Sequence, residues 1–255
     1  MSAPAVAWHI TPEQATAFLA NDPVSGIELL CAIRYDRDIR CVGALREGTL
    51  AGVLVVTRED DDALAARFEA VDTAALLPLI AACPPGVQRI AVHRPWMLPA
   101  LAPAFRLVPG QTETVFVATA VTPPPVSPAV RSLTLADTPL MDRGATMMGG
   151  KGLRDGLAQG YRPFGVVTGN RVVAHAVAAN RTGWTEEVMS VWTSPRRRGQ
   201  GLATAVVAAT AADILSHGKT AIYVAAITNR ASQRVAVKVG FQPAYDITTY
   251  YVVQR

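Results

Sequence analysis

A short basic segment with two glycines, residues 196–201, has the composition of an anion-binding loop. Its sequence is Arg-Arg-Arg-Gly-Gln-Gly, and it lies between a segment rich in Val and Met that ends at Thr193 and a long apolar segment at 202–217. Glycine lets the backbone turn tightly and approach a ligand closely. A helix that begins after such a turn presents unpaired N–H groups and the positive end of its dipole. The segment therefore predicts a phosphate site at a helix N-terminus, strengthened by three arginines.

The spacing of these residues narrows the kind of phosphate site. The segment lacks the Gly-Lys-Ser/Thr of a P-loop and the three glycines of the dinucleotide-binding fingerprint. The pattern Arg196-x-x-Gly199-x-Gly201 instead resembles the Arg/Gln-x-x-Gly-x-Gly/Ala signature of the GNAT superfamily of N-acetyltransferases. In that family the signature lies between the fourth strand and the following helix, which is where it lies in the predicted elements of this chain.

A second segment is similar to the closing motif of the same family. Asn229 follows a predicted strand, and the predicted helix after it ends in the residues Lys-Val-Gly-Phe at 238–241. The two motifs occur in the family's order, and the resemblance covers residues 129–255. It implies a GNAT-like fold for this half of the chain.

The resemblance also implies an activity and a cofactor site. The family binds acetyl-CoA between two splayed strands and transfers the acetyl group to an amine by direct attack on the thioester. Backbone groups hold the pantetheine arm, and one N–H polarises the thioester carbonyl, which is an oxyanion-hole role. The residues that the match assigns to cofactor binding are Met189, Ser190, Val191, Arg196, Arg197, Arg198, Gly199, Gln200, Gly201, Leu202, Ala203, Asn229 and Ser232.

The acid that protonates the leaving thiolate departs from the family pattern. Many members have a Tyr seven residues after the Asn, and this chain has Ala236 there. We take Tyr250, in the last predicted strand, as the candidate replacement. The alternatives are that Tyr250 is an ordinary strand aromatic and that water protonates the thiolate. Tyr223 lies in a buried predicted strand and is interpreted as a core residue.

Two adjacent carboxylates, Glu186 and Glu187, begin the predicted strand that leads into the basic loop. Because side chains alternate along a strand, Glu187 is expected to share a face with Met189 and Val191, and Glu186 to take the other face. We therefore take Glu187 as the candidate base for the amine. The alternative is that both are solvated charges at the end of a strand.

The chain divides near its midpoint at a proline-rich segment. Four prolines in residues 121–128 exclude a regular helix or a central strand and predict a linker. We expect an α/β fold with a mixed sheet, in which residues 129–255 form the catalytic GNAT domain and residues 1–120 a smaller α/β domain. The halves have similar element orders without a residue-level repeat. The N-terminal half is thus left open as a degenerate second GNAT-like domain, as in a tandem GNAT protein, as a wall of the acceptor site, or as an oligomer interface.

Periodicity supplies the elements on which these expectations depend. The predicted helices are 11–20, 73–82, 95–105, 137–148, 151–159, 202–217 and 230–239. The predicted strands are 40–45 and 50–57 as a hairpin, 63–71, 87–92, 112–118, 130–135, 164–168 and 171–180 as a second hairpin, 186–193 and 220–226, with one or two closing strands in 240–253.

Composition excludes other classes of protein. The three cysteines and four histidines have no metal-ligand or redox spacing, so we expect reduced thiols and no metal. No apolar run approaches the roughly 18–20 residues that span a bilayer, and the N-terminus lacks a signal-peptide pattern, so we expect a cytoplasmic protein. The net charge of +4 is modest, and its basic residues cluster rather than form a stripe, which argues against nucleic acid.

The sequence therefore predicts an N-acetyltransferase that uses acetyl-CoA and acetylates an amine of a small molecule or peptide. No nucleic-acid or membrane partner is expected, and a homodimer is left open. The alternative function is a non-catalytic module with a GNAT-like fold that binds acyl-CoA or serves as an interaction surface.

Overall fold

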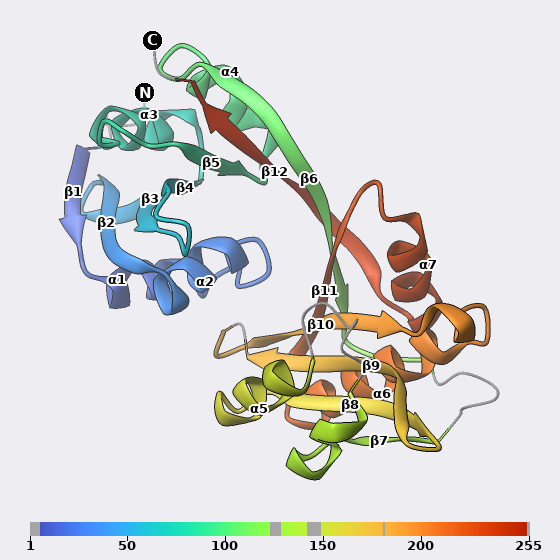
Figure 1. The fold of residues 1–255 in the computed structure, drawn as a ribbon. Coiled ribbons are helices and arrows are strands. Elements are labelled where there is room, and N and C mark those ends of the chain that lie inside the picture. Colours follow the sequence, from blue (N-terminus) through green and yellow to red (C-terminus); the bar gives the residue numbers. More distant parts are fainter. Residues whose placement is uncertain (1–5, 123–128, 142–148, 181, 254–255) are drawn as a thin grey trace. The chain divides into compact units, whose positions relative to one another are not determined.

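The computed structural model describes residues 6–122, 129–141, 149–180 and 182–253. These residues form two compact units, which Figure 1 shows as ribbons. Unit 1 comprises Met1–Glu113 and Tyr245–Arg255, and unit 2 comprises Thr114–Ala244.

The compact units do not coincide with the domains expected at residues 1–120 and 129–255. The last strand, Gln242–Val252, begins in unit 2 and continues into unit 1, where its residues Thr248 to Tyr251 pair with residues 92 to 89. Residues 123–128 of the predicted linker lie outside the described residues. The expected division into functional domains stays a prediction.

Unit 1 is a mixed sheet with helices on both faces. Strand β4 is antiparallel to β3 and parallel to β5, and β12 is antiparallel to β5. Helices α1 and α2 pack on one face of the sheet, and α3 and α4 pack on the other. Its elements are β1 (Val6–Ile10), α1 (Pro12–Leu19), α2 (Ile27–Tyr35), β2 (Arg37–Arg46), β3 (Thr49–Arg58), β4 (Leu64–Ala70), α3 (Thr73–Ala82), β5 (Arg89–Val92), η1 (Pro95–Met97), α4 (Leu98–Leu101), the first part of β6 (Leu107–Ala118) and the second part of β12 (Gln242–Val252).

Unit 2 has the same kind of sheet. Strands β7 to β10 are antiparallel neighbours, and β10 is parallel to β11. Its elements are the end of β6, β7 (Val130–Ser132), η2 (Leu135–Leu140), α5 (Gly150–Ala158), β8 (Arg162–Thr168), β9 (Arg171–Asn180), β10 (Thr185–Thr193), η3 (Pro195–Arg197), α6 (Leu202–Ser216), β11 (Thr220–Ala226), α7 (Arg230–Val239) and the start of β12.

The described elements of the two units follow the same order: a strand, two helical segments, three strands, a helix, a strand, helical residues and a final strand. In each unit the fourth and fifth of these strands form the parallel pair. The predicted mixed α/β fold is confirmed, and the similar element order extends over both halves of the chain.

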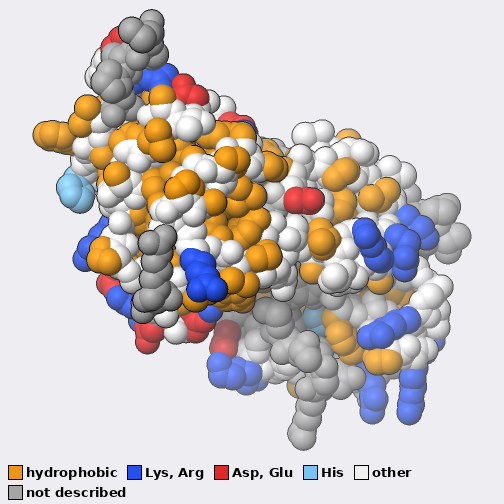
Figure 2. Space-filling model, turned by 90° about the horizontal axis from the view of Figure 1, so that it is seen from above, with side chains coloured by type: hydrophobic (Ala, Val, Ile, Leu, Met, Phe, Trp, Pro, Cys, Tyr) orange, Lys and Arg blue, Asp and Glu red, His pale blue; other side chains and the backbone are white. Residues whose placement is uncertain are grey.

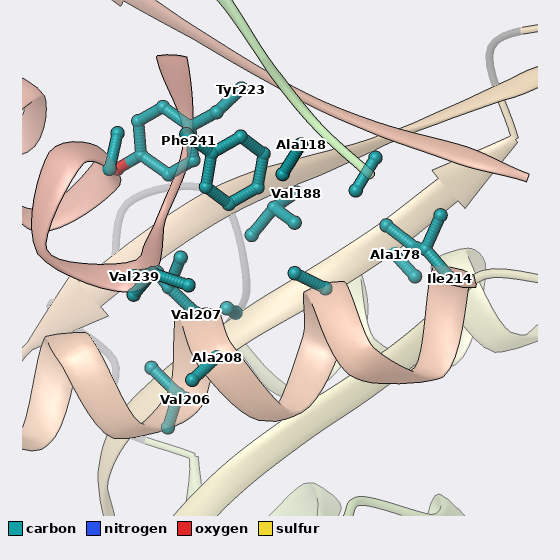
Figure 3. Close-up of a cluster of buried hydrophobic side chains, with 14 of the residues drawn as sticks. Ala118, Ala178, Val188, Val206, Val207, Ala208, Ile214, Tyr223, Val239 and Phe241 are labelled. Atoms are coloured by element: carbon teal, nitrogen blue, oxygen red, sulfur yellow. The ribbon is translucent and has the colours of Figure 1, made fainter. Parts of the chain in front are cut away.

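Helix α6 is central to unit 2 because almost all its surface is apolar. Such a helix is stable when it is buried. Figure 3 shows Val206, Val207, Ala208 and Ile214 of α6 packed in one cluster with side chains of the sheet and of α7. The burial holds α6 against the sheet and thereby fixes the position of its N-terminus. No helix among the described residues is long and apolar enough to cross a membrane.

The three cysteines are reduced and shielded. Cys31 and Cys41 are buried and Cys83 is half-buried. Burial raises the pKa of the Cys41 thiol to about 11, with the charge of Glu13 as a smaller cause, and burial raises the pKa of Cys83 to about 12.

We expect Ellman's reagent at pH 8 to react slowly with the native protein and rapidly with all three cysteines after denaturation. The thiolate is the reactive form, and burial disfavours it at Cys41 and Cys83. The measurement is the absorbance of the released thiol chromophore with and without guanidinium. Rapid reaction of Cys41 or Cys83 in the native protein would contradict the expected burial.

Candidate functional site

A pocket of about 550 Å³ lies in unit 2 at the N-terminal ends of α6 and α7. Its lining comes from the end of β10, the basic loop, the first turn of α6, β11 and one side of α7. The lining residues that the sequence assigned to cofactor binding are Val191, Arg197, Arg198, Gly199, Gly201, Leu202, Ala203, Asn229 and Ser232. The assigned residues outside the lining are Met189, Ser190, Arg196 and Gln200.

Two glycines shape the loop that enters α6. Gly199 has φ +77° and Gly201 has φ +76°, in the left-handed region that side chains disfavour. Gly201 is the N-cap residue of α6, and no described side chain caps this helix start. The first N–H groups of α6 thus face a pocket with the positive end of the helix dipole behind them. This is the geometry of an anion site.

The charged groups of the lining reinforce that geometry. Arg197 and Arg198 come from the loop, and Arg234 and Lys238 come from α7, whereas no acidic residue of the described chain lines the pocket. Arg234 and Lys238 are four residues apart, so they lie on one side of the helix. Neither residue was predicted to line the site, although Lys238 belongs to the closing motif and the i, i+4 spacing of the two basic residues is visible in the sequence. The charge distribution favours a polyanionic ligand.

The parallel strands β10 and β11 separate beside this pocket. Their pairs run from Thr185 opposite Thr220 to Glu187 opposite Ile222, and within the described residues the remainder of β10 is paired only with β9. The pairing with β9 shifts between Met189 and Trp192, and Ser190 has φ +53°. A β-bulge of this kind redirects the following side chains and leaves backbone groups outside the ladder.

The bulge corrects one expectation about β10. Glu187 and Met189 share a face, because they pair with Ala179 and Val177 of β9 and alternate as in a regular strand. Val191 was expected on that face, but it packs against the cluster on the α6 side. The extra residue at Ser190 reverses the alternation, which a regular strand pattern cannot predict.

Glu186 and Glu187 are both buried, with exposed fractions of 2% and 5%. The alternative that they are solvated strand-end charges is therefore wrong. Glu186 accepts hydrogen bonds from Arg162 at 2.5 Å and from Lys219 at 2.7 Å. Burial alone would raise the pKa of the Glu186 carboxyl, but these two cations outweigh burial and lower its pKa. Glu186 thus belongs to an ion-pair network, whereas Glu187 lies on the opposite face of β10.

Tyr250 is not among the described residues that line the pocket. Tyr250 lies in unit 1, where it pairs with Ile90 and packs against the cluster that includes α3 and α4. The whole last strand was expected in the C-terminal domain, but β12 continues into unit 1. The catalytic role expected for Tyr250 stays a prediction without support from this pocket.

Another tyrosine, Tyr223, lines the pocket. Its ring is buried, as predicted, and its hydroxyl lies 2.7 Å from Oγ of Ser232. The backbone N–H of Ser232 donates to Oδ1 of Asn229 at 3.1 Å, so Asn229 caps α7. The resemblance implied that Asn229 and Ser232 lie at the cofactor. The hydrogen bond between the hydroxyls of Tyr223 and Ser232 could not be predicted, because it joins β11 to α7 through a tertiary contact.

His175 and Trp192 form a stack between β9 and β10. Their ring centroids are 5.5 Å apart, with planes inclined by 19°. Burial lowers the pKa of His175 to about 4, although a backbone hydrogen bond at Ser190 acts in the opposite direction. His175 is thus a neutral core residue at neutral pH, and it supports Trp192 at the edge of the pocket.

The corresponding helix start in unit 1 differs in two respects. Only Val71 and Asp72 connect β4 to α3, and the Asp72 carboxylate accepts a hydrogen bond from the N–H of Ala75 at 2.9 Å. The adjoining pocket of about 540 Å³ is lined by α3 and by the α4 region without a charged residue. Figure 2 shows hydrophobic side chains gathered on this face of unit 1. A polyphosphate at the start of α3 would meet the carboxylate of Asp72 and an apolar surface.

Comparison with known proteins supports the fold. Residues 164–252 match the sequence model of a family described as FR47-like protein. The chain is similar to a GNAT-family acetyltransferase from Colwellia psychrerythraea, with 13% identity, 97% of this chain and 99% of that chain covered, and a TM-score of 0.62. It is also similar to a GCN5-related N-acetyltransferase from Kribbella flavida, with 14% identity, 91% and 95% covered, and a TM-score of 0.60.

A third similar structure is a tandem GNAT protein from the clavulanic acid biosynthesis pathway. The identity is 14%, 98% of each chain is covered, and the TM-score is 0.57. No curated protein matches the chain in sequence. The resemblance to the GNAT superfamily is confirmed in the C-terminal region, and the fold of GNAT acetyltransferases, including a tandem one, extends over nearly the whole chain.

Proposed function

We propose that unit 2 binds acetyl-CoA in its pocket and transfers the acetyl group to an amine of a small molecule or peptide. The observation that carries this proposal is the glycine-opened, uncapped start of α6, which faces a pocket whose charged lining residues are all basic. A pyrophosphate matches this combination of free N–H groups, helix dipole and arginines. The GNAT fold supports an acyl-CoA rather than another phosphate compound as the ligand.

In this proposal each part of the pocket binds one part of acetyl-CoA. Arg197, Arg198 and the N–H groups that follow Gly199 hold the pyrophosphate. The pantetheine arm runs between β10 and β11, where backbone groups beyond Glu187 are free of the β10–β11 ladder. An N–H of the bulged segment 189–191 polarises the thioester carbonyl, which stabilises the oxyanion that forms during attack.

The amine is expected to approach from the opposite face of the sheet. Glu187 and Met189 lie on that face, away from α6, so the Glu187 carboxylate is our candidate to accept the proton of the attacking amine. The nitrogen attacks the carbonyl carbon, the C–N bond forms, and the C–S bond breaks. Thioester and amine thus meet where the two strands separate, which holds them in reactive geometry.

One observation favours the second candidate function, a non-catalytic acyl-CoA-binding module. Ala236, at the position where the resemblance expects an acid, is fully buried and cannot protonate a thiolate. Binding would then persist without transfer. The two functions make different predictions in one experiment.

We expect titration calorimetry to detect one acetyl-CoA per chain, because Asp72 caps the corresponding helix start in unit 1. We also expect transfer to at least one compound in a panel of amines, amino acids and peptides, measured as released CoA thiol and confirmed as acetylated product by mass spectrometry. Slow reaction of the protein's own thiols keeps the background of this assay low.

The outcomes separate the candidates. Binding without transfer to any amine in the panel would favour the non-catalytic module. Absence of both heat and thermal stabilisation would contradict acyl-CoA binding altogether. Two sites per chain would contradict the assignment of the site to unit 2 alone.

A further inference from the structure

Tyr223 lines the pocket with a buried phenol that takes no part in the steps of the proposed reaction. We propose that Tyr223 is the catalytic acid that protonates the CoA thiolate, with Ser232 as its hydrogen-bond partner. This inference rests on the proposed function, because it requires acetyl-CoA in the unit 2 pocket. It offers an alternative to Tyr250, which is not a described lining residue of this pocket.

The position of Tyr223 along β11 puts it where the strands separate. The last pair between β10 and β11 joins Glu187 to Ile222, so Tyr223 is the next residue on β11. Paired residues of neighbouring strands share a face and side chains alternate, so Tyr223 lies on the face opposite Glu187. A base on one face and an acid on the other suit a reaction in which the amine enters from one side and the thiol leaves from the other.

Packing holds the phenol ring in one orientation. Tyr223 meets Phe241 with ring centroids 5.8 Å apart and planes inclined by 61°, and Figure 3 shows the two rings side by side. Only 2% of Tyr223 is exposed. The hydroxyl end reaches Oγ of Ser232 at 2.7 Å, and Asn229 fixes Ser232 at the start of α7. The hydroxyl is therefore positioned from two directions, by the core behind it and by the helix cap in front.

The surroundings keep the phenol protonated. Burial raises the pKa of Tyr223, the hydrogen bond with Ser232 lowers it, and the nearby charge of Glu187 raises it, so that the net shift is upward. A group with a raised pKa carries its proton at neutral pH, as a general acid must. Tyr223 is the one phenol among the described residues of the lining.

The small side chain of Ala236 is consistent with this arrangement. Ala236 and Ser232 are one turn apart on the same side of α7, and Ala236 belongs to the same buried cluster as Tyr223. A methyl group on this side of α7 leaves room for a ring supplied by the neighbouring strand. The hydroxyl absent from α7 is thus provided by β11.

The proton transfers balance in this scheme. When the C–S bond breaks, sulfur leaves with the electron pair and takes the proton of the Tyr223 hydroxyl. The phenolate regains a proton from the Ser232 hydroxyl, which is reprotonated by solvent through the pocket. The proton of the amine goes to Glu187, which releases it to solvent, so that no net proton is taken up. The products are the acetylated amine and CoA thiol.

The test is Tyr223→Phe, which removes the hydroxyl and keeps the ring. We expect kcat to fall about 100-fold while KM for acetyl-CoA changes by less than about twofold, because the lost interaction forms only with the leaving thiolate. A second readout needs no acceptor. The pKa of the thiol of bound CoA, followed by thiolate absorbance, should rise by about one unit when its hydrogen-bond donor is removed.

Tyr245→Phe is the matched control. Tyr245 is half-buried and its hydroxyl donates to the carbonyl oxygen of Val24 at 2.6 Å, but it lies in unit 1. The control should lose stability without losing kcat. If Tyr223→Phe unfolds, Ser232→Ala replaces it, and kcat should then fall about 10-fold because the phenolate loses its proton source.

Failure of the proposed function and failure of the inference about Tyr223 give different results. If the wild type binds no CoA, the proposed function and this inference fall together. If the wild type binds CoA, but Tyr223→Phe leaves the thiol pKa unshifted and any kcat within about twofold, Tyr223 is a packing residue and only the inference is overturned.

Discussion

The Gly201→Asp protein is expected to show no rise in melting temperature with acetyl-CoA, and a binding affinity lowered by more than about 100-fold, or about 2.7 kcal/mol. Gly201 is the N-cap of α6 and lines the pocket. An aspartate there would accept the helix N–H groups that the pyrophosphate needs and would add a negative charge beside the ligand. Unit 1 already contains this arrangement, in which Asp72 caps α3.

The variant should fold, so that lost binding can be attributed to the site. A side chain at φ +76° costs about 1–2 kcal/mol, but aspartate is a favoured N-cap and offsets part of this cost. The control is Gly218→Asp, just beyond the other end of α6, where φ is +71° and a Cβ would also meet open space. It should cost similar stability and keep binding. Equal loss of affinity in both variants, or normal affinity in Gly201→Asp, would contradict the pyrophosphate site.

The Glu187→Gln protein is expected to bind acetyl-CoA normally and to lose about 100-fold in kcat. Glutamine keeps the size and polarity of the buried side chain but cannot accept a proton from the amine. Steady-state kinetics with the best amine of the panel would measure the effect, and calorimetry with acetyl-CoA would verify that binding is retained. A kcat within about threefold of the wild type would mean that the base lies elsewhere.

Glu186, the neighbour of Glu187 on the other face of β10, provides the control for this prediction. Glu186→Gln should keep kcat but lower the free energy of unfolding by about 1–3 kcal/mol, because the half-buried cations Arg162 and Lys219 lose a buried charged partner. The folded-state pKa of Glu186 is lowered, so its contribution is present above the unfolded pKa of 4.5 and is lost as pH falls through the folded value. Thermal unfolding of the variant should therefore depend less on pH below 4.5 than that of the wild type.

Local patterns in the sequence predicted much of the fold. The helix expected at 73–82 is α3, those at 202–217 and 230–239 are α6 and α7, and the hairpin at 40–57 is β2 and β3. These elements have caps, periodic apolar residues or turn glycines that act within a few residues. Helix α2, at Ile27–Tyr35, was missed, and it has no side-chain cap at its start. Where a helix was expected at 137–148, the structure has the 3-10 helix η2 (Leu135–Leu140), which contains Pro139, and residues 142–148 lie outside the described residues.

Features that depend on distant contacts could not be predicted in this way. The bulge at Ser190 and the meeting of Tyr223 with Ser232 arise from packing between elements. The same holds for the final strand, whose partner β5 lies about 160 residues earlier by the pair Thr248–Val92. The basic loop was recognised because its anion-binding function depends on consecutive residues, whereas the acid and base depend on which strand faces which helix.

The final strand also sets an order for the assembly of the protein on the ribosome. Unit 2 is a continuous stretch, Thr114–Ala244, and all of its residues are made before Tyr245. Most of unit 1 is synthesised earlier, yet β5 pairs with residues 248–251 and must wait for them with one side unpaired. An exposed strand edge invites pairing with other chains. Unit 1 is therefore synthesised first but completed last. The edge of β5 stays open to pairing with other chains during the whole synthesis of unit 2.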